Sequence, residues 1–267
     1  MNPFKNAEPL AFHPQSITTH IFSLILRTML LPLLLSTLLP LTASTPHPPL
    51  LPRQTPSGPC KDHHIFMARG AGDPYPGTLG GLPALVCKGV ASCDYEDILY
   101  VGTFDKVCAS VDVGVVNATM QIRSYGARCP GAKLAVLGHS EGAAVMGNVL
   151  GGGSTSFSGC TMKTTGANTP ASVAFSQILA VALTGDMRHT ASQAYNVGTG
   201  KAKNGIWPRS TAELTGLNAW SAKLRTWCED SDPVCANGSN VQTHGAYFTR
   251  FGQEIADWMR GMLGIGA

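Results

Sequence analysis

Short apolar runs alternate with longer amphipathic segments along most of this chain. A buried strand is typically a continuous apolar run of about four to eight residues between turn residues, whereas a helix repeats its apolar positions every three or four residues. These patterns predict strands at 64–68, 97–101, 133–137 and 177–184, and helices at 79–87, 108–128, 141–150, within 211–227 and at 247–263. Strands separated by helices predict a parallel sheet with helices on both faces, which is the α/β class.

The amino-terminal part follows a different pattern. An apolar run at 20–43 ends in small residues at 42–44, which is the layout of a secretory signal peptide cleaved after Ser44. The run is also near the ~20 residues that a membrane anchor requires. Its internal prolines and its small-residue end favour the secretory interpretation, so we expect a signal peptide at 1–44.

Proline is frequent in the next segment, 45–59, which predicts an unstructured spacer. The remaining residues, 60–267, are enough for one domain with a substantial core. Met29 is an alternative start, and residues 1–28 would then be an upstream extension.

The charge balance and the cysteines narrow the possible partners. The net charge is +3 with 13% charged residues and no basic block, so nucleic acid and anionic membranes are poor candidates. All eight cysteines follow the apolar run, and an even number in a secreted chain indicates disulfides. Zinc is the alternative, but no cysteine pair has C-x₂-C spacing and His63-His64 lacks further ligands nearby, so we expect no metal site. Glycosylation sequons at Asn117 and Asn237 suit the same compartment.

The sequence GHSEG follows the apolar run at 133–137 and places Ser140 between Gly138 and Gly142. A serine at this point could simply cap the following helix. The two glycines favour a nucleophile elbow, because that turn strains the serine backbone and leaves no room for side chains two residues before and after it. Such a turn lifts the serine hydroxyl to the carboxyl end of the sheet, beside the N–H groups of a helix start.

Two histidines lie well downstream of Ser140, where an α/β hydrolase places its base. His189 has Asp186 three residues before it, which leaves little chain to bring both side chains to the far end of a sheet. His244 follows CEDSDPVC at 228–235, where two aspartates lie between cysteines. A disulfide across that segment would hold a carboxylate against the imidazole, and the alternative is a solvated acidic loop with a structural crosslink.

These motifs together resemble the fungal cutinases and the related acetylxylan esterases. The resemblance includes MARGAGDPYPGTLG, YGARCPGAKL and GDMRHTASQAYNVGTG, and it extends over 59–263. It implies a small, lidless α/β hydrolase with a five-stranded parallel sheet and no cofactor. The family pattern C-x-x-x-D-x-V-C matches Asp232 rather than Asp230, so the implied catalytic triad is Ser140, Asp232 and His244.

The resemblance also assigns the oxyanion hole to the backbone N–H groups of Ala71 and Glu141. The chain departs from the family at both positions: it has His139-Ser140-Glu141 where Tyr-Ser-Gln is usual, and Ala71 where a serine or threonine hydroxyl is usual. A carboxylate aimed into the hole would oppose the developing charge. We therefore expect the Glu141 side chain to face away, at a helix start that stabilises a carboxylate by roughly 0.3–1 kcal/mol.

The cysteine pairing follows from the same resemblance. Eight cysteines allow 105 pairings, so the sequence alone does not choose among them. The resemblance implies Cys60–Cys129 and Cys228–Cys235, and the remaining cysteines would then pair as Cys87–Cys93 and Cys108–Cys160.

The implied function is a secreted, monomeric serine esterase that acts on esters of plant cell-wall polymers. Cutinases place aliphatic residues in the loop before the histidine, whereas here that loop reads ANGSNVQTH, with Val241 as its one large aliphatic residue. This composition favours short acyl groups such as acetyl on polysaccharide, with cutin as the second candidate. The other class of function is a catalytically weak effector that binds the host wall or a receptor; the altered oxyanion residues motivate it, and the intact triad argues against it.

Overall fold

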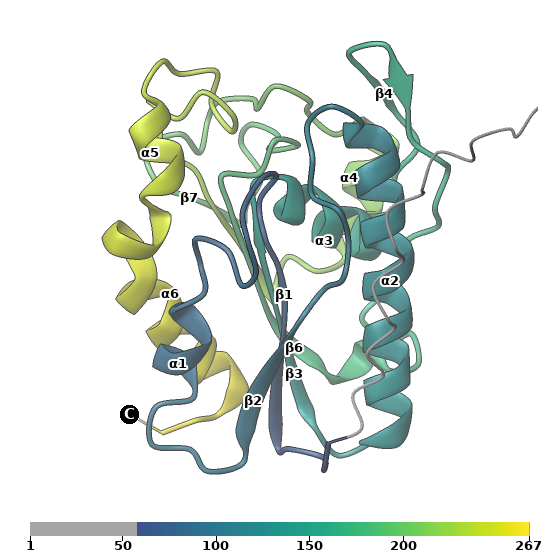
Figure 1. The fold of residues 1–267 in the computed structure, drawn as a ribbon, viewed down its shortest axis with the longest axis vertical. Helices are drawn as coiled ribbons and strands as arrows, with labels where there is room; N and C mark the ends of the chain where they lie inside the picture. Colours follow the sequence, from purple (N-terminus) through teal and green to yellow (C-terminus); the bar gives the residue numbers. More distant parts are fainter. Residues whose placement is uncertain (1–57, 267) are drawn as a thin grey trace, which may run out of the picture. The chain divides into compact units, whose positions relative to one another are not determined.

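A six-stranded sheet forms the centre of the computed structural model, which describes residues 58–266 (Figure 1). Every strand in this sheet pairs in parallel with its neighbours. In order across the sheet, the strands are β2 (Cys93–Asp97), β1 (His63–Ala68), β3 (Lys133–His139), β6 (Ile178–Thr184), β8 (Leu224–Trp227) and β7 (Asn196–Val197).

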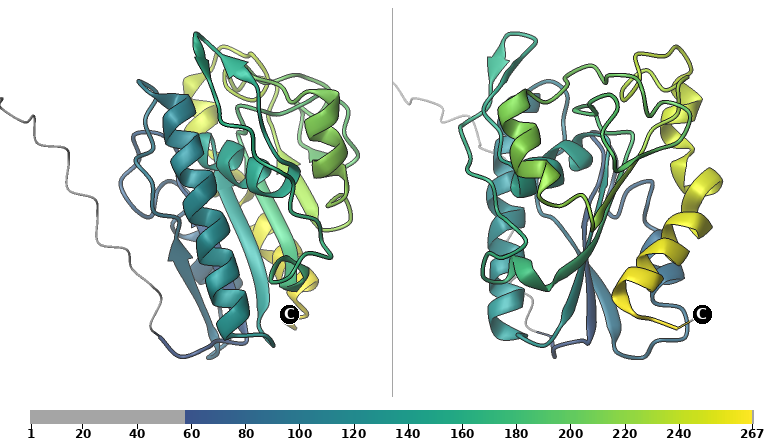
Figure 2. Two further views of the ribbon diagram at one scale, coloured as in Figure 1. Left: turned by 90° about the vertical axis from the view of Figure 1, so that its right-hand side faces the viewer. Right: turned by 180° about the vertical axis from the view of Figure 1, so that it is seen from behind.

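Helices cover both faces of the sheet (Figures 1 and 2). One face packs against α1 (Leu82–Val86) and α6 (Tyr247–Leu263), and the other against α2 (Val107–Arg128), α3 (Glu141–Gly151) and α4 (Thr211–Asn218). The short helix α5 (Val241–Gly245) precedes α6, a 3₁₀ turn spans Phe175–Gln177, and β4 (Ser156–Phe157) and β5 (Cys160–Thr161) form a separate hairpin.

The central strands are apolar on both sides because both sides are buried. Along β3, Leu134 and Val136 pack toward α2 and α3, whereas Ala135 and Leu137 pack toward α1 and α6. The sequence therefore shows a continuous apolar run at β3 rather than alternation. The same burial fixes the carboxyl end of β3, where Ser140 begins the next turn.

The predicted α/β class and parallel sheet are confirmed, with two differences in the strands. The predicted strand at 97–101 is wrong: β2 lies at Cys93–Asp97 instead, while Ile98 and Tyr100 are buried in the core beyond its end. The edge position of β2 explains the error, because charged residues are tolerated there and remove the apolar pattern. The sheet has six strands rather than five because the two-residue β7 adds to its far edge.

Four disulfides join elements that are distant in sequence or close a short loop. They are Cys60–Cys129, Cys87–Cys93, Cys108–Cys160 and Cys228–Cys235, which are the four pairs expected. The first and third anchor the two ends of α2, the second links the end of α1 to β2, and the fourth closes a loop after β8.

The expected signal peptide at 1–44 and all but the last two residues of the expected spacer at 45–59 lie outside the described residues. Among the described helices, none has the length and apolar character that crossing a membrane requires.

Candidate active site

Ser140 lies at the turn between β3 and α3, with φ of 55° and ψ of −118°. A non-glycine residue in such a conformation costs on the order of 1–3 kcal/mol and persists only where its surroundings enforce it. The side chain makes no capping hydrogen bond to α3, so the interpretation of Ser140 as a simple helix cap is wrong. The hydroxyl instead lies 2.9 Å from Nε2 of His244.

Gly138 and Gly142 are required by the close packing of this turn. A Cβ added to Gly138 would lie 2.7 Å from the carbonyl oxygen of Gly142, and one added to Gly142 would lie 2.1 Å from that of Ala68. Neither contact is possible without moving backbone. The spacing of the glycines around Ser140 therefore reflects contact between the helix start and the ends of β1 and β3.

Ser140, His244 and Asp232 form a continuous chain of hydrogen bonds. Nδ1 of His244 lies 2.9 Å from Oδ2 and 3.1 Å from Oδ1 of Asp232. An ionised carboxylate only accepts hydrogen bonds, so Nδ1 carries the proton and Nε2 accepts from the Ser140 hydroxyl. The structure thus brings together the three residues that the resemblance implied, although Ser140 and His244 are 104 positions apart.

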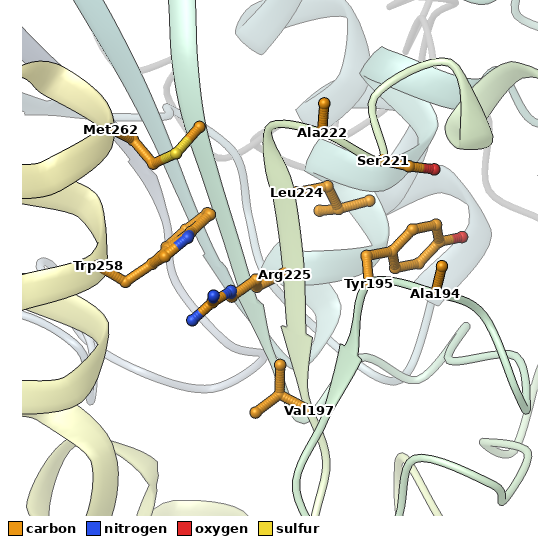
Figure 3. A pocket seen from close by; sticks show the side chains of 9 residues that line it. All are labelled: Ala194, Tyr195, Val197, Ser221, Ala222, Leu224, Arg225, Trp258 and Met262. Atoms are coloured by element: carbon orange, nitrogen blue, oxygen red, sulfur yellow. The ribbon is translucent and has the colours of Figure 1, made fainter.

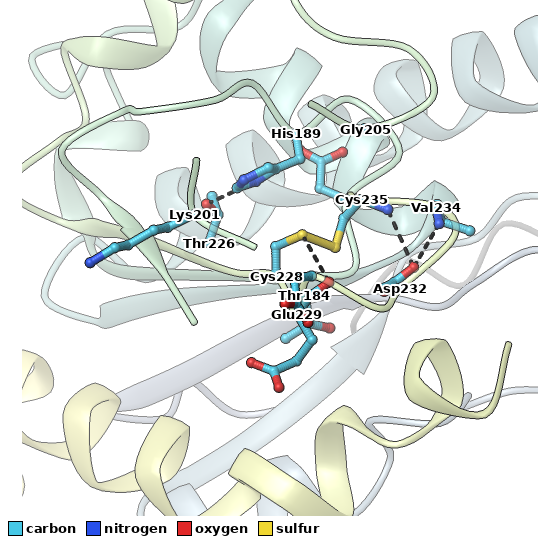
Figure 4. The surroundings of a disulfide bond; sticks show 12 residues. Thr184, His189, Lys201, Gly205, Thr226, Cys228, Glu229, Asp232, Val234 and Cys235 are labelled. Atoms are coloured by element: carbon cyan, nitrogen blue, oxygen red, sulfur yellow. Dashed lines mark hydrogen bonds between the residues drawn. A yellow bond between two sulfur atoms is a disulfide. The ribbon is translucent and has the colours of Figure 1, made fainter. Parts of the chain in front are cut away.

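Asp232 is fully buried and is held by several donors. The backbone N–H groups of Val234 and Cys235 donate to its Oδ1, at 2.7 and 3.3 Å, inside the loop that Cys228–Cys235 closes (Figure 4). Burial by itself would raise the pKa of Asp232, but the hydrogen bonds from His244, Val234 and Tyr247 outweigh it and lower the pKa below its ordinary value. Asp232 is therefore ionised at neutral pH.

Asp230, the other aspartate in the loop, is exposed and takes no part in this chain of hydrogen bonds. His189 and Asp186 are both buried, and their contacts are with residues other than Ser140. Asp186 pairs with Arg209 at 2.6 Å, and Nδ1 of His189 lies 3.5 Å from the Thr226 hydroxyl. The structure therefore selects between the candidate acids and bases as the family pattern implied.

Tyr247 is a site residue that the sequence analysis missed. Its buried hydroxyl donates to Oδ2 of Asp232 at 2.8 Å and accepts from the backbone N–H of Glu229 at 3.0 Å. Tyr247 is three residues after His244, at the first position of α6. This spacing is the only sequence signal that could have indicated that both residues bond to Asp232. Tyrosines at helix starts are too common to be recognised in this way.

The expected oxyanion donors lie on two neighbouring segments. Among the described residues, no acceptor bonds to the backbone N–H of Ala71 or to that of Glu141, so both are free to bind an incoming oxygen. The loop that carries Ala71 runs beside the serine, because a Cβ added to Gly70 would lie 3.4 Å from Cβ of Ser140. Gly72 fixes this loop by donating to the carbonyl of Gly102 at 2.9 Å.

The Glu141 side chain differs from expectation. It is fully buried, and neither carboxyl oxygen has a hydrogen-bond partner among the described residues. Burial raises its pKa to about 7, although the nearby Ser110 hydroxyl, Arg69 and the Thr103 N–H favour the charged form. The expectation of a carboxylate stabilised by the helix start is therefore wrong, because desolvation exceeds the modest benefit of the helix dipole.

His139, which precedes the serine, packs beside the other imidazole. Its ring centroid lies 4.8 Å from that of His244, and its Nδ1 lies 3.0 Å from the hydroxyl of Thr184. Burial, followed by repulsion from His244, lowers the pKa of His139 to about 4. It is therefore neutral at physiological pH and does not compete with His244 as a cation.

Two other features lie apart from this site. His64 pairs with Asp94 at 2.5 Å, and within residues 58–266 no group of three or more potential metal ligands occurs. A hollow of about 590 Å³ opens at the sheet edge beside α6 (Figure 3), and no triad or oxyanion residue lines it. Its lining residues are Ala194, Tyr195, Val197, Ser221, Ala222, Leu224, Arg225, Trp258 and Met262.

Comparison with known proteins gives consistent matches. A family model described as Cutinase matches residues 59–263. Acetylxylan esterase 2 of Talaromyces purpureogenus is 28% identical over 216 residues, covering 79% of this chain and 84% of that protein. Cutinase 11 of Verticillium dahliae is 29% identical over 222 residues, covering 78% and 70%. A solved acetylxylan esterase is 27% identical with a TM-score of 0.68, covering 77% of this chain and 100% of that one.

Proposed function

We propose a serine-esterase mechanism for this chain, which belongs to the cutinase family and is a carboxylic ester hydrolase. The observation that carries the proposal is the 2.9 Å contact between Ser140 Oγ and His244 Nε2, continued by the 2.9 Å contact from His244 Nδ1 to Asp232. A strained serine turn supports it, because such strain is concentrated at functional sites.

In the proposed mechanism, His244 takes the proton of the Ser140 hydroxyl while the oxygen attacks the ester carbonyl carbon. The carbonyl oxygen becomes negatively charged and accepts hydrogen bonds from the N–H groups of Ala71 and Glu141. His244 then gives its proton to the departing alcohol, which leaves an acyl group on Ser140. Asp232 orients the imidazole and stabilises its cationic form throughout.

Water completes the reaction by repeating these steps on the acyl-enzyme. His244 removes a proton from the water as its oxygen attacks the acyl carbon, and it returns that proton to Ser140 as the bond to the serine breaks. The products are a carboxylic acid and the free enzyme. No cofactor takes part in any of these steps.

The proposed substrates are acetyl esters of plant cell-wall polysaccharide. Similarity to proteins named acetylxylan esterase supports this, as does the loop before His244, where Val241 is the one large aliphatic residue and is 69% exposed. Longer acyl esters of the cutin type are the second candidate. The exposed apolar residues Val101 and Phe104 favour them, because their loop bonds directly to the loop of Ala71.

The test is to compare the parent chain with Ser140→Ala on acetylated xylan, on cutin and on aryl esters of increasing acyl length. We expect acetate release from xylan, the highest kcat/KM on acetyl esters, and no activity in Ser140→Ala. A clear preference for long acyl chains would make cutin-type esters the first candidate substrate and acetyl esters the second. A folded parent that hydrolyses none of these esters but binds the polysaccharide would instead establish the effector function.

The proposed setting is extracellular, and the proposed state is a monomer. Four disulfides support an oxidising compartment, and the apolar run at 20–43 supports a signal peptide. Amino-terminal sequencing of the secreted protein should give a start near residue 45, and light scattering should give the mass of one chain. Glycan analysis of Asn117 and Asn237 belongs to the same experiment.

A further inference from the structure

Glu141 combines two features, one in its backbone and one in its side chain. Its backbone N–H is a proposed oxyanion donor, and its carboxyl group is wholly buried without a hydrogen-bond partner among the described residues. The neutral form of this carboxyl group is favoured, because the cost of desolvating the charge outweighs the support that Ser110, Arg69 and Thr103 give to it. The reaction as proposed above makes no use of this side chain.

The groups near this carboxyl hold the walls of the oxyanion hole. Arg69 donates to the carbonyl oxygens of Gly70, Tyr100 and Val101 at 3.2, 2.9 and 2.6 Å. The Tyr100 hydroxyl donates to the carbonyl of Arg69. The Arg69 Nε is also buried without a hydrogen-bond partner, so it makes no hydrogen bond to the Glu141 carboxyl group.

A second contact joins the same loops from the side of α2. The hydroxyl of Ser110 accepts from the backbone N–H groups of Gly102 and Thr103, at 3.0 and 3.3 Å. Gly102 in turn accepts from Gly72, next to the proposed donor Ala71. The Glu141 carboxyl thus lies among the contacts that position both halves of the oxyanion hole.

We propose that Glu141 is a positioning residue that supports ester hydrolysis best as a neutral acid, and that its ionisation in place weakens the oxyanion hole. The inference rests on the proposed function. When the carboxyl group is neutral, the N–H donors determine the electrostatic potential in the oxyanion hole. When it is ionised, a negative charge one residue from the nucleophile repels the developing oxyanion. The penalty falls on the transition state, so kcat should change and KM should not.

The pH at which this occurs follows from the groups around Glu141. Its pKa of about 7 makes it neutral in slightly acidic solution and charged in alkaline solution. The pKa of Tyr100 is raised by burial and by Glu141, and the pKa of His139 is lowered to about 4, so neither changes charge in this range. The charges that act on these groups are the Arg69 cation and the carboxylates of Asp73 and Asp232.

Stability should depend on pH in the same direction. The folded pKa of Glu141 is above its ordinary value of 4.5, so the folded chain holds a proton that the unfolded chain releases. Its unfavourable contribution is therefore absent below about pH 4.5, grows between about pH 4.5 and 7, and is constant above that range. Glu141→Gln removes this contribution while keeping the shape of the side chain.

The experiment measures kcat and KM for phenyl acetate, by chromatography of released acetate, from pH 5.5 to 9.5. The parent chain, Glu141→Gln and the control Glu254→Gln are compared, with melting temperatures across the same range. Glu254 lies on α6 and accepts from Trp227, so its substitution removes the same charge elsewhere and keeps an accepting oxygen. We expect kcat of the parent and the control to fall about tenfold from pH 6 to 9, and kcat of Glu141→Gln to change less than twofold.

The melting temperature of Glu141→Gln should exceed that of the parent by a margin that widens from pH 5.5 to about 7 and then stays constant. An alkaline fall in kcat shared by Glu141→Gln, or a margin independent of pH, would overturn the inference. So would a variant that has already lost most of its kcat at pH 6, because that would require an ionised carboxylate. If no variant hydrolyses any ester, the proposed function fails, and the melting temperatures still decide whether Glu141 is protonated in the folded chain.

Discussion

The hydroxyl of Tyr247 should contribute to both catalysis and stability, because it is one of the donors that hold Asp232. In Tyr247→Phe, the buried carboxylate loses its 2.8 Å bond and the Glu229 N–H loses its acceptor. A hydrogen bond to a charged group contributes about 1.5–3 kcal/mol. We expect unfolding free energy to fall by about 2 kcal/mol, which corresponds to a melting temperature lower by about 4–8 °C for a domain of this size.

The catalytic effect of Tyr247→Phe comes from Asp232. With one donor fewer, the carboxylate is less firmly held against His244, and we expect kcat to fall about tenfold, or about 1.4 kcal/mol. The pKa of Asp232 should also rise. Its lowered folded pKa contributes stability that is present above the ordinary value of 3.8 and is lost as pH falls through the folded value. The acid-unfolding midpoint of Tyr247→Phe should therefore lie at higher pH than that of the parent.

Steady-state kinetics and thermal unfolding from pH 2 to 8 measure these effects together. Tyr195→Phe is the matched control, because the Tyr195 hydroxyl is buried and has no hydrogen-bond partner among the described residues. Its removal should leave kcat unchanged and should not lower the melting temperature. A Tyr247→Phe variant that loses stability but keeps kcat within twofold of the parent would refute the positioning role and leave Tyr247 a structural residue.

Two further substitutions test the oxyanion hole and the acid loop. Ala71→Ser should restore the hydroxyl donor usual in the family and raise kcat about tenfold with little change in KM, as steady-state kinetics would show; an unchanged or lower kcat in a folded variant contradicts the placement of Ala71. Replacing both Cys228 and Cys235 by serine opens a loop with a separation of 7 residues, and replacing both Cys60 and Cys129 opens one of 69. The loss of chain entropy corresponds to about 2.4 kcal/mol for Cys228–Cys235 and about 4.4 kcal/mol for Cys60–Cys129. Denaturant titrations should therefore show the larger loss of stability without Cys60–Cys129, whereas kcat should fall more without Cys228–Cys235. Full kcat without Cys228–Cys235 would show that the crosslink does not position Asp232.

The sequence predicted the interior of the fold better than its edges. The apolar runs at β3 and β6 are buried except for the partly exposed Leu179, and burial on both faces leaves a pattern that is easy to recognise. At the edge of the sheet, β2 carries Asp94 and Glu96, whose pairing with His64 compensates for the missing apolar residues. Such compensation depends on contacts with another strand and cannot be seen within the segment itself.

The candidate site shows the same division. The motif around Ser140 could be recognised because backbone geometry requires its glycines at fixed positions. The roles of Asp232 and His244 came from family resemblance, since local sequence left two aspartates and two histidines open. The burial of Glu141 and the contact of Tyr247 with Asp232 were not predictable, because both depend on segments that meet only in the folded chain.

Reaction with an aryl phosphonate ester tests the central claim most directly, because phosphonylation of a serine, with loss of the aryl alcohol, requires the activated hydroxyl that the triad would supply. Intact-mass spectrometry of the parent should show one adduct, and peptide mapping should place it on Ser140. Ser140→Ala should not react, and His244→Ala should react at a rate lower by at least about a thousandfold. A folded parent that takes up no phosphonate, or takes it up at another residue, would contradict the assignment of Ser140 as nucleophile.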